Sequence, residues 1–195
     1  MSEDKRHPVI REEAYVSVDV ETAGPNPSTF SMLSIGACLV DDPACTFYVE
    51  LQPVNDNCIP GALAISDLSM ETLAEEGVPP LDAMARFEAW VHAHVPRTHR
   101  PIFVAFNAPF DWMFVNDYFH RYLEHNPFGH SALDIKAFYM GLTGVPWART
   151  SMKYLHRRYL DGRELTHNAL RDAQDQAELF AQILKKAREY HASDL

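Results

Sequence analysis

The chain has 195 residues, of which 47% are hydrophobic and 23% charged, the size and balance of one ordinary globular domain. No run approaches the roughly 18 consecutive apolar residues of a transmembrane helix, and the polar N-terminus lacks the apolar core of a signal peptide. Three cysteines without a CxxC spacing argue against a disulfide framework and a cysteine zinc site. We therefore expect a cytoplasmic protein that makes no contact with membranes.

The net charge is strongly negative, because 17 Lys and Arg oppose 27 Asp and Glu and leave −10. A net anion repels the phosphates of nucleic acid, so tight binding to a long duplex is not expected. One basic stretch, residues 149–163, is either a phosphate-binding surface or the solvated face of a helix. Its side chains are Arg149, Lys153, His156, Arg157, Arg158 and Arg163.

Hydrophobic patterning predicts one α/β domain over residues 14–190, preceded by a flexible arm (1–13) and followed by a short tail (191–195). Three alternating segments come first, and their short connections predict an antiparallel meander. These strands are predicted at residues 14–21, 33–39 and 46–51.

Helices and strands alternate in the rest of the chain, which predicts a mixed sheet with helices packed on it. Two further strands are predicted at residues 101–106 and 133–135, the first of them buried on both faces. The last helix carries the clearest apolar stripe. Helices are predicted at residues 64–74, 81–95, 111–123, from 135 to an end at Gly141, 151–159 and 168–190.

Two carboxylates lie two positions apart at the end of the first predicted strand. Side chains alternate across a strand, so Asp19 and Glu21 point to the same side. Like charges held together destabilise a fold unless a cation neutralises them, and hard cations such as Mg²⁺ prefer oxygen ligands. The pair is therefore either a polar strand end in solvent or part of a metal site.

A third carboxylate, Asp111, opens the helix that follows the buried strand, in the segment FNAPFDWMF. Ligands of α/β folds bind beyond the ends of such strands. Asp111 therefore either reaches a site at the sheet edge or caps its own helix, and Asn107 is either a site residue or a turn residue.

The last predicted helix begins within the segment HNALRD, residues 167–172. Asn168 has the chemistry of an N-cap, and Asp172 lies about 100° from the centre of the apolar stripe, where a carboxylate can reach a cleft. His167 lies in the loop before the helix. The alternative is a surface acid and an ordinary loop histidine, since the chain has 10 His.

Together and in this order, these motifs resemble those of DEDDh-type 3'-5' exonucleases of the DnaQ-like superfamily, which includes ribonuclease T, oligoribonuclease and proofreading exonucleases. The resemblance extends from about residue 14 to residue 184 and implies a ribonuclease H-like fold, with a mixed five-stranded sheet flanked by helices. Asp134 in ALDIK resembles an acidic position that supports such a site without binding metal. The matching residues are Asp19 and Glu21 in VDVET, Asp111 in NAPFD, and His167 and Asp172 in HNALRD.

The resemblance also implies a mechanism. Asp19, Glu21, Asp111 and Asp172 are expected to bind two divalent cations, Mg²⁺ or Mn²⁺, around the scissile phosphate. His167 is the expected general base, because an imidazole can accept a proton near neutral pH. The expected reaction releases nucleoside 5′-monophosphates from the 3′ end of single-stranded or short DNA or RNA.

Residues beside the motifs are the candidates for binding substrate, because aromatic rings stack on the bases of single strands and cations bind phosphates. For each aromatic residue the alternative is a place in the core. The chain stays acidic even without the four metal-binding acids, so we expect it to hold only a few nucleotides. The candidates are Thr22, Phe30, Met32, Asn107, Phe110, Arg149 and Lys153.

Two other functions remain open at this point. One is a proofreading or accessory exonuclease subunit that acts mainly through a protein partner. The other is a non-catalytic nucleic-acid-binding module of the same fold, which the complete set of five motif residues disfavours. The resemblance to ribonuclease T and oligoribonuclease also implies a possible homodimer.

Overall fold

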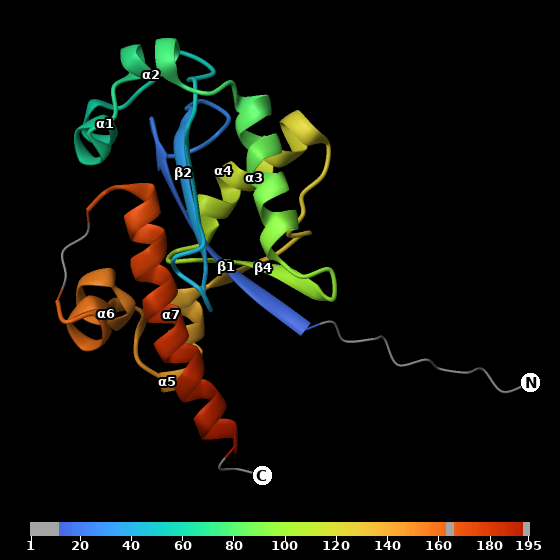
Figure 1. The fold of residues 1–195 in the computed structure, drawn as a ribbon. Coiled ribbons are helices and arrows are strands. Elements are labelled where there is room, and N and C mark those ends of the chain that lie inside the picture. The colour runs from blue at the N-terminus through green and yellow to red at the C-terminus, as the bar shows by residue number, and fades with distance from the viewer. Residues whose placement is uncertain (1–11, 163–165, 193–195) are drawn as a thin grey trace, which may run out of the picture.

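A five-stranded sheet with the strand order β3-β2-β1-β4-β5 forms the centre of the molecule (Figure 1). The computed structural model describes residues 12–162 and 166–192. The three leading strands pair antiparallel, whereas β4 and β5 run parallel to β1. The predicted mixed sheet, with its antiparallel meander first, is confirmed. The strands are β1 (Glu12–Thr22), β2 (Met32–Leu39), β3 (Thr46–Glu50), β4 (His99–Ala105) and β5 (Ala132–Asp134).

Helices cover both faces of this sheet. The helices are α1 (Pro60–Ser66), α2 (Met70–Glu76), α3 (Pro80–His94), α4 (Pro109–Leu123), α5 (Ile135–Thr143), the 3₁₀ helix η1 (Trp147–Thr150), α6 (Met152–Tyr159) and α7 (Ala169–Ala192). The long helix α7 crosses one face with α5 and α6 beside it, and α3 and α4 lie on the other face (Figure 1). Within the described ranges, no helix has the length and apolar character needed to span a membrane.

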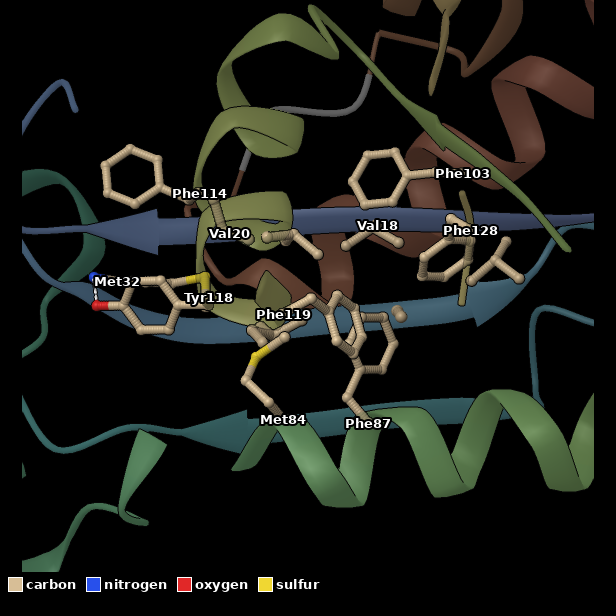
Figure 2. Close-up of a cluster of buried hydrophobic side chains, with 14 of the residues drawn as sticks. Val18, Val20, Met32, Met84, Phe87, Phe103, Phe114, Tyr118, Phe119 and Phe128 are labelled. Carbon is tan, nitrogen blue, oxygen red and sulfur yellow. Dashed lines mark hydrogen bonds between the residues drawn. The ribbon is translucent and has the colours of Figure 1, made fainter. Parts of the chain in front are cut away.

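The face of the sheet beneath α3 and α4 is packed with apolar side chains. Val16, Val18 and Val20 of β1 all point to this face and are buried there. Phe87 of α3 stacks on Phe119 of α4 with 5.7 Å between ring centroids (Figure 2). Burying side chains of this size is the main source of folding free energy. This cluster is therefore the principal core.

The opposite face of β1 changes character along the strand. Near the start of β1, Tyr15 packs edge-on against Phe180 of α7, with 5.3 Å between ring centroids. Toward the end of β1, the same face carries Asp19 and Glu21. Gly36 of β2 pairs directly with Asp19, and a Cβ atom on Gly36 would lie 2.2 Å from the backbone of α7. The glycine therefore lets the first turn of α7 sit close to the strand ends.

Two predicted helix boundaries are wrong. The helix predicted over residues 64–74 is divided, because Asp67 adopts a left-handed conformation with φ of 60° and Ser69 caps a new helix by accepting the Thr72 amide. Gly141 does not end α5. The helix continues to Thr143, and Gly144, at φ of 67°, ends it in the left-handed conformation that favours glycine.

The ends of the domain differ slightly from the prediction. β1 begins at Glu12, two residues before the predicted strand. The rest of the predicted arm, the candidate Arg163 and residues 193–195 lie outside the described residues. The apolar stripe of the last helix is confirmed, since Ala173, Ala177 and Phe180 are fully buried.

Candidate active site

The strand end of β1 brings the first two predicted carboxylates together with a third from α7. One carboxylate oxygen from each of Asp19, Glu21 and Asp172 lies within 4.8 Å of the other two. Such a set of oxygen donors suits a hard divalent cation and no soft metal. The donor chemistry therefore fits the predicted metal site.

Asp111 joins this group from the first turn of α4. Its Oδ1 atom accepts the backbone amide of Val20 at 3.2 Å, which ties the helix start to the end of β1. Asn107, at φ of 65°, makes the turn between β4 and α4 in a left-handed conformation that asparagine tolerates. The turn thus directs the start of α4 back across the end of the sheet.

Asp134 supports this turn, as predicted, and is not among the cleft-lining residues described below. Its Oδ2 atom accepts the amide of Ala108 at 2.7 Å. Its Oδ1 atom accepts the amide of Ala137, also at 2.7 Å, and so caps α5. One carboxylate therefore holds the loop before Asp111 against the start of the next helix.

The start of α7 positions Asp172 and His167. Asn168 caps the helix, because its Oδ1 atom accepts the amide of Arg171 at 3.2 Å. The Oδ1 atom of Asp172 accepts the hydroxyl of Thr166 at 3.1 Å and its amide at 3.2 Å. His167 lies in the loop between Thr166 and Asn168. Its φ of 51° is a conformation rare for residues other than glycine.

The four carboxylates and His167 line one cleft of about 240 Å³. It brings together the five residues predicted from the sequence motifs, and adds aromatic, polar and apolar neighbours from the turn after β4 and from α4, α6 and α7. The lining residues are Asp19, Val20, Glu21, Phe106, Asn107, Phe110, Asp111, Met152, His167, Asp172 and Gln176.

Burial of the carboxyl groups raises their pKa values. Desolvation, followed by the charges of Asp111, Glu21 and Asp172, holds the pKa of Asp19 well above its ordinary value. Desolvation and the charge of Asp172 raise the pKa of Glu21 to about 7. Desolvation raises the pKa of Asp111 to about 8, although the amide of Val20 opposes the shift. The cleft therefore holds negative charge that a bound cation would relieve.

Gln176 is a site residue that the motifs did not single out. Its Nε2 atom donates to Asp19 Oδ1 at 2.6 Å, and its Oε1 atom accepts the amide of Phe106 at 2.8 Å. It therefore links α7, β1 and the end of β4. Its position four residues after Asp172 places both side chains on the same face of α7, and this spacing is the signal that would have found it.

The predicted substrate-binding residues divide into two groups. Asn107 and Phe110 line the cleft, and the others do not. Met32 is fully buried in the core and Thr22 is also buried, with its hydroxyl donating to the carbonyl of Gly24. The ring of Phe30 packs over Gly24, partly buried against Leu33 and Leu73. Arg149 and Lys153 are exposed on η1 and α6.

A mixed five-stranded sheet that gathers four carboxylates and a histidine beyond its central strand is the architecture expected of the DEDDh-type 3'-5' exonucleases. Residues 14–184 match the family model described as the 3'-5' exoribonuclease Rv2179c-like domain. The chain is 45% identical to the 3'-5' DNA exonuclease Cap18 of Escherichia coli, over 89% of this chain and 92% of the relative. It is 31% identical to ribonuclease T of Shewanella oneidensis, over 88% of this chain and 82% of the relative.

Solved structures share the fold. The nuclease domain of 3'hExo, a DEDDh family member bound to rAMP, superposes with a TM-score of 0.73 at 13% identity, over 90% of this chain and 93% of that one. Escherichia coli exonuclease I in complex with a dT13 oligonucleotide gives 0.69 at 18% identity, over 94% and 43%. The chain belongs to the Rv2179c-like family of DEDDh-type 3'-5' exonucleases. It is a phosphodiester hydrolase, and its fold and acidic cluster imply divalent metal ions.

Proposed function

We propose that this protein is a metal-dependent 3'-5' exonuclease that shortens single-stranded or short oligonucleotides and releases nucleoside 5′-monophosphates. The observation that carries the proposal is the meeting of Asp19, Glu21 and Asp172 within 4.8 Å in a cleft that Asp111 and His167 also line. Four carboxylates and one imidazole, delivered by three separate elements and one loop, thus converge on one cleft.

The four carboxylates would hold two cations, Mg²⁺ or Mn²⁺. Bound there, divalent cations activate the attacking water and stabilise the negative charge on the leaving 3′ oxygen. Gln176 orients the Asp19 carboxylate by donating to its Oδ1 atom, and the Val20 amide does the same for Asp111. Both contacts fix carboxylate oxygens before any ligand arrives, which is the preorganisation that metal sites require.

His167 would accept the proton of the attacking water. It lines the cleft from a loop and is exposed to solvent. A loop position lets the ring move between the cleft and water, so that it can pass the proton on after each turnover. Phe106 and Phe110, on either side of Asn107, offer apolar surface in the same cleft for the terminal base.

The net charge of the chain and the names of its relatives indicate the class of substrate. An acidic chain has few cations to bind a long duplex, which favours a short single strand. The relative at 45% identity is named as a DNA exonuclease, whereas the family is described by exoribonuclease activity. We therefore propose single-stranded DNA as the first substrate and RNA as the alternative.

The test is a substrate panel on the purified chain without any partner. Dinucleotides to 20-mers of DNA and RNA are compared with Mg²⁺, Mn²⁺ and excess chelator, and a 3′-phosphorylated strand serves as the blocked control. We expect mononucleotide release that depends on metal and on a free 3′ hydroxyl. Activity in excess chelator would overturn the metal mechanism, and activity only with an added protein would favour an accessory subunit.

The base assignment is tested with His167→Ala and His167→Gln. Loss of a general base lowers turnover by about 10²- to 10⁴-fold. Metal binding, measured by calorimetry on the same variants, should stay close to wild type, because the four carboxylates remain. Near wild-type turnover in both variants would remove His167 from the mechanism.

A further inference from the structure

A lysine and a tryptophan lie together at the rim of the catalytic cleft. Lys136, in the first turn of α5, donates from Nζ to Asn107 Oδ1 at 3.4 Å. The same Nζ atom lies 4.2 Å from the ring centroid of Trp147 in η1, and 5.8 Å from that of Phe106. Because Phe106 and Asn107 line the cleft, Lys136 and Trp147, which we call the rim pair, continue its wall outward.

Trp147 is unusual for its exposure. It is 51% exposed, whereas Trp90 and Trp112 pack against the main core. An exposed indole gains little for the fold, but it offers a stacking surface that any nucleic acid base can use. The ammonium of Lys136 over the ring adds a cation–π contact that holds both side chains in place.

The distribution of charge around the cleft suits Lys136 to phosphate binding. Of the described residues that line the cleft, four are carboxylates and none is Lys or Arg. A strand leaving the cleft therefore finds no lysine or arginine for its outer phosphates among these described lining residues. Lys136 is a cation beside that cleft, because it contacts the lining residues Asn107 and Phe106. Arg149 of η1 and Lys153 of α6 are exposed on the elements that follow, and η1 contacts both α5 and α6.

We propose that the rim pair is a subsite for the nucleotide on the 5′ side of the two that flank the scissile bond. Trp147 stacks on its base and Lys136 binds its phosphate. This subsite rests on the proposed function. It adds affinity for strands of three or more nucleotides and contributes nothing to a dinucleotide, which ends before it reaches the rim.

The experiment compares kcat/KM across substrate length for Trp147→Ala, Trp147→Phe and Lys136→Gln. The substrates are DNA strands of two, three, four and six nucleotides. For Trp147→Ala we expect a loss of about five- to 150-fold on three or more nucleotides, the range for removing one stacking partner. Dinucleotide hydrolysis should be unchanged. Trp147→Phe should recover most of the loss, because it keeps an aromatic face.

Lys186→Gln is the matched control. It removes a cation–π contact of the same kind, in which Lys186 Nζ lies 4.4 Å from the ring centroid of Tyr159. Neither residue lines the cleft, so kcat/KM should match wild type at every length. An equal loss on dinucleotides and hexanucleotides in Trp147→Ala and Lys136→Gln would overturn the subsite, as would no loss at any length.

A binding measurement separates this proposal from the proposed function. Hexathymidylate is titrated into the protein in chelator, where no hydrolysis occurs, and tryptophan fluorescence is recorded. Quenching in wild type that disappears in Trp147→Phe supports the subsite, even if the chain hydrolysed none of the strands. Identical quenching in both proteins would place the strand elsewhere and overturn it.

Discussion

The two faces of β1 show how one strand serves both stability and chemistry. Val16, Val18 and Val20 point to the face covered by α3 and α4, where apolar burial stabilises the fold. Figure 2 shows Val18 and Val20 within this core. The alternate residues Asp19 and Glu21 point to the face covered by α7, where desolvation raises their pKa values. Without bound metal, the acidic face lowers the stability of the fold. Substituting a valine of β1 should therefore lower stability and spare activity, whereas substituting a neighbouring acid should lower activity and raise the stability of the metal-free fold.

The largest effect is expected from Asp19→Asn. The amide keeps the shape but removes a metal-binding charge, so hydrolysis should fall at least about a thousandfold, which corresponds to about 4 kcal/mol. The metal-free variant should unfold at a higher temperature than wild type at pH 8, because a partly buried, desolvated carboxylate and its repulsion by Asp111 are gone. Rate assays and thermal melts in chelator measure the two effects.

The same comparison would fail if Asp19→Asn lowered both activity and melting temperature. Such a result would mean that the charged carboxylate of Asp19 stabilises the metal-free fold. Asp175→Asn on α7 is the matched control, because it makes the same chemical change outside the residues that line the cleft.

A substitution on the other face, Phe87→Ala, should affect stability alone. Phe87 is fully buried and stacks on Phe47 and Phe119, so its truncation should cost about 3–5 kcal/mol of unfolding free energy. Activity per folded molecule should hold below the lowered melting temperature. Leu81→Ala on the same helix, at a side chain 50% exposed, should change stability by less than about 0.5 kcal/mol. Urea unfolding gives both values.

Gln176→Ala tests the contact between the site and the sheet. It removes the donor to Asp19 and leaves the Phe106 amide without its acceptor. Loss of such a supporting contact typically costs about 10- to 100-fold in metal affinity or activity. Gln174→Ala is the control, since that side chain donates to the carbonyl of Pro43 from the same helix. A metal titration of kcat would show no shift if Gln176 were only a packing residue.

The smallest effect is a pH dependence of the stabilisation by metal. The raised pKa values, about 7 for Glu21 and about 8 for Asp111, mean that the folded chain favours the protonated groups. These groups therefore weaken the metal-free fold increasingly as pH rises from about 4 to about 8. The rise in melting temperature on adding Mn²⁺ should be larger at pH 8 than at pH 6, and a larger rise at pH 6 would contradict the assigned shifts.

Much of the site was predictable because its residues follow local rules. The period of two in β1 placed Asp19 and Glu21 on one side, and the helical periodicity of α7 placed Asp172 at the edge of its buried face. The position of Met32 was not predictable in this way. The alternation predicts a strand that begins only at residue 33, whereas Met32 already belongs to β2. Met32 pairs with Thr22 across an irregularity in the register of β1 and β2, and its amide donates to the Tyr118 hydroxyl.

The rim pair escaped prediction for a related reason. Lys136 and Trp147 meet only because α5 and η1 fold back on each other, and no periodicity in the sequence encodes that contact. The break at Asp67 was missed because a left-handed aspartate leaves no composition signal comparable to Gly or Pro. Hydrophobic patterning therefore predicts neither contacts between distant elements nor single unusual backbone angles.

The geometry of the site depends on Gly36, a residue with no reactive group. It stands opposite Asp19, and its missing side chain sets how near α7 can dock. One added methyl group would push the helix outward and carry Asp172 away from its partner acids while every named reactive group stayed in the chain. The geometry of the site therefore depends on a position that has no side chain, and a protein engineer should leave Gly36 unchanged.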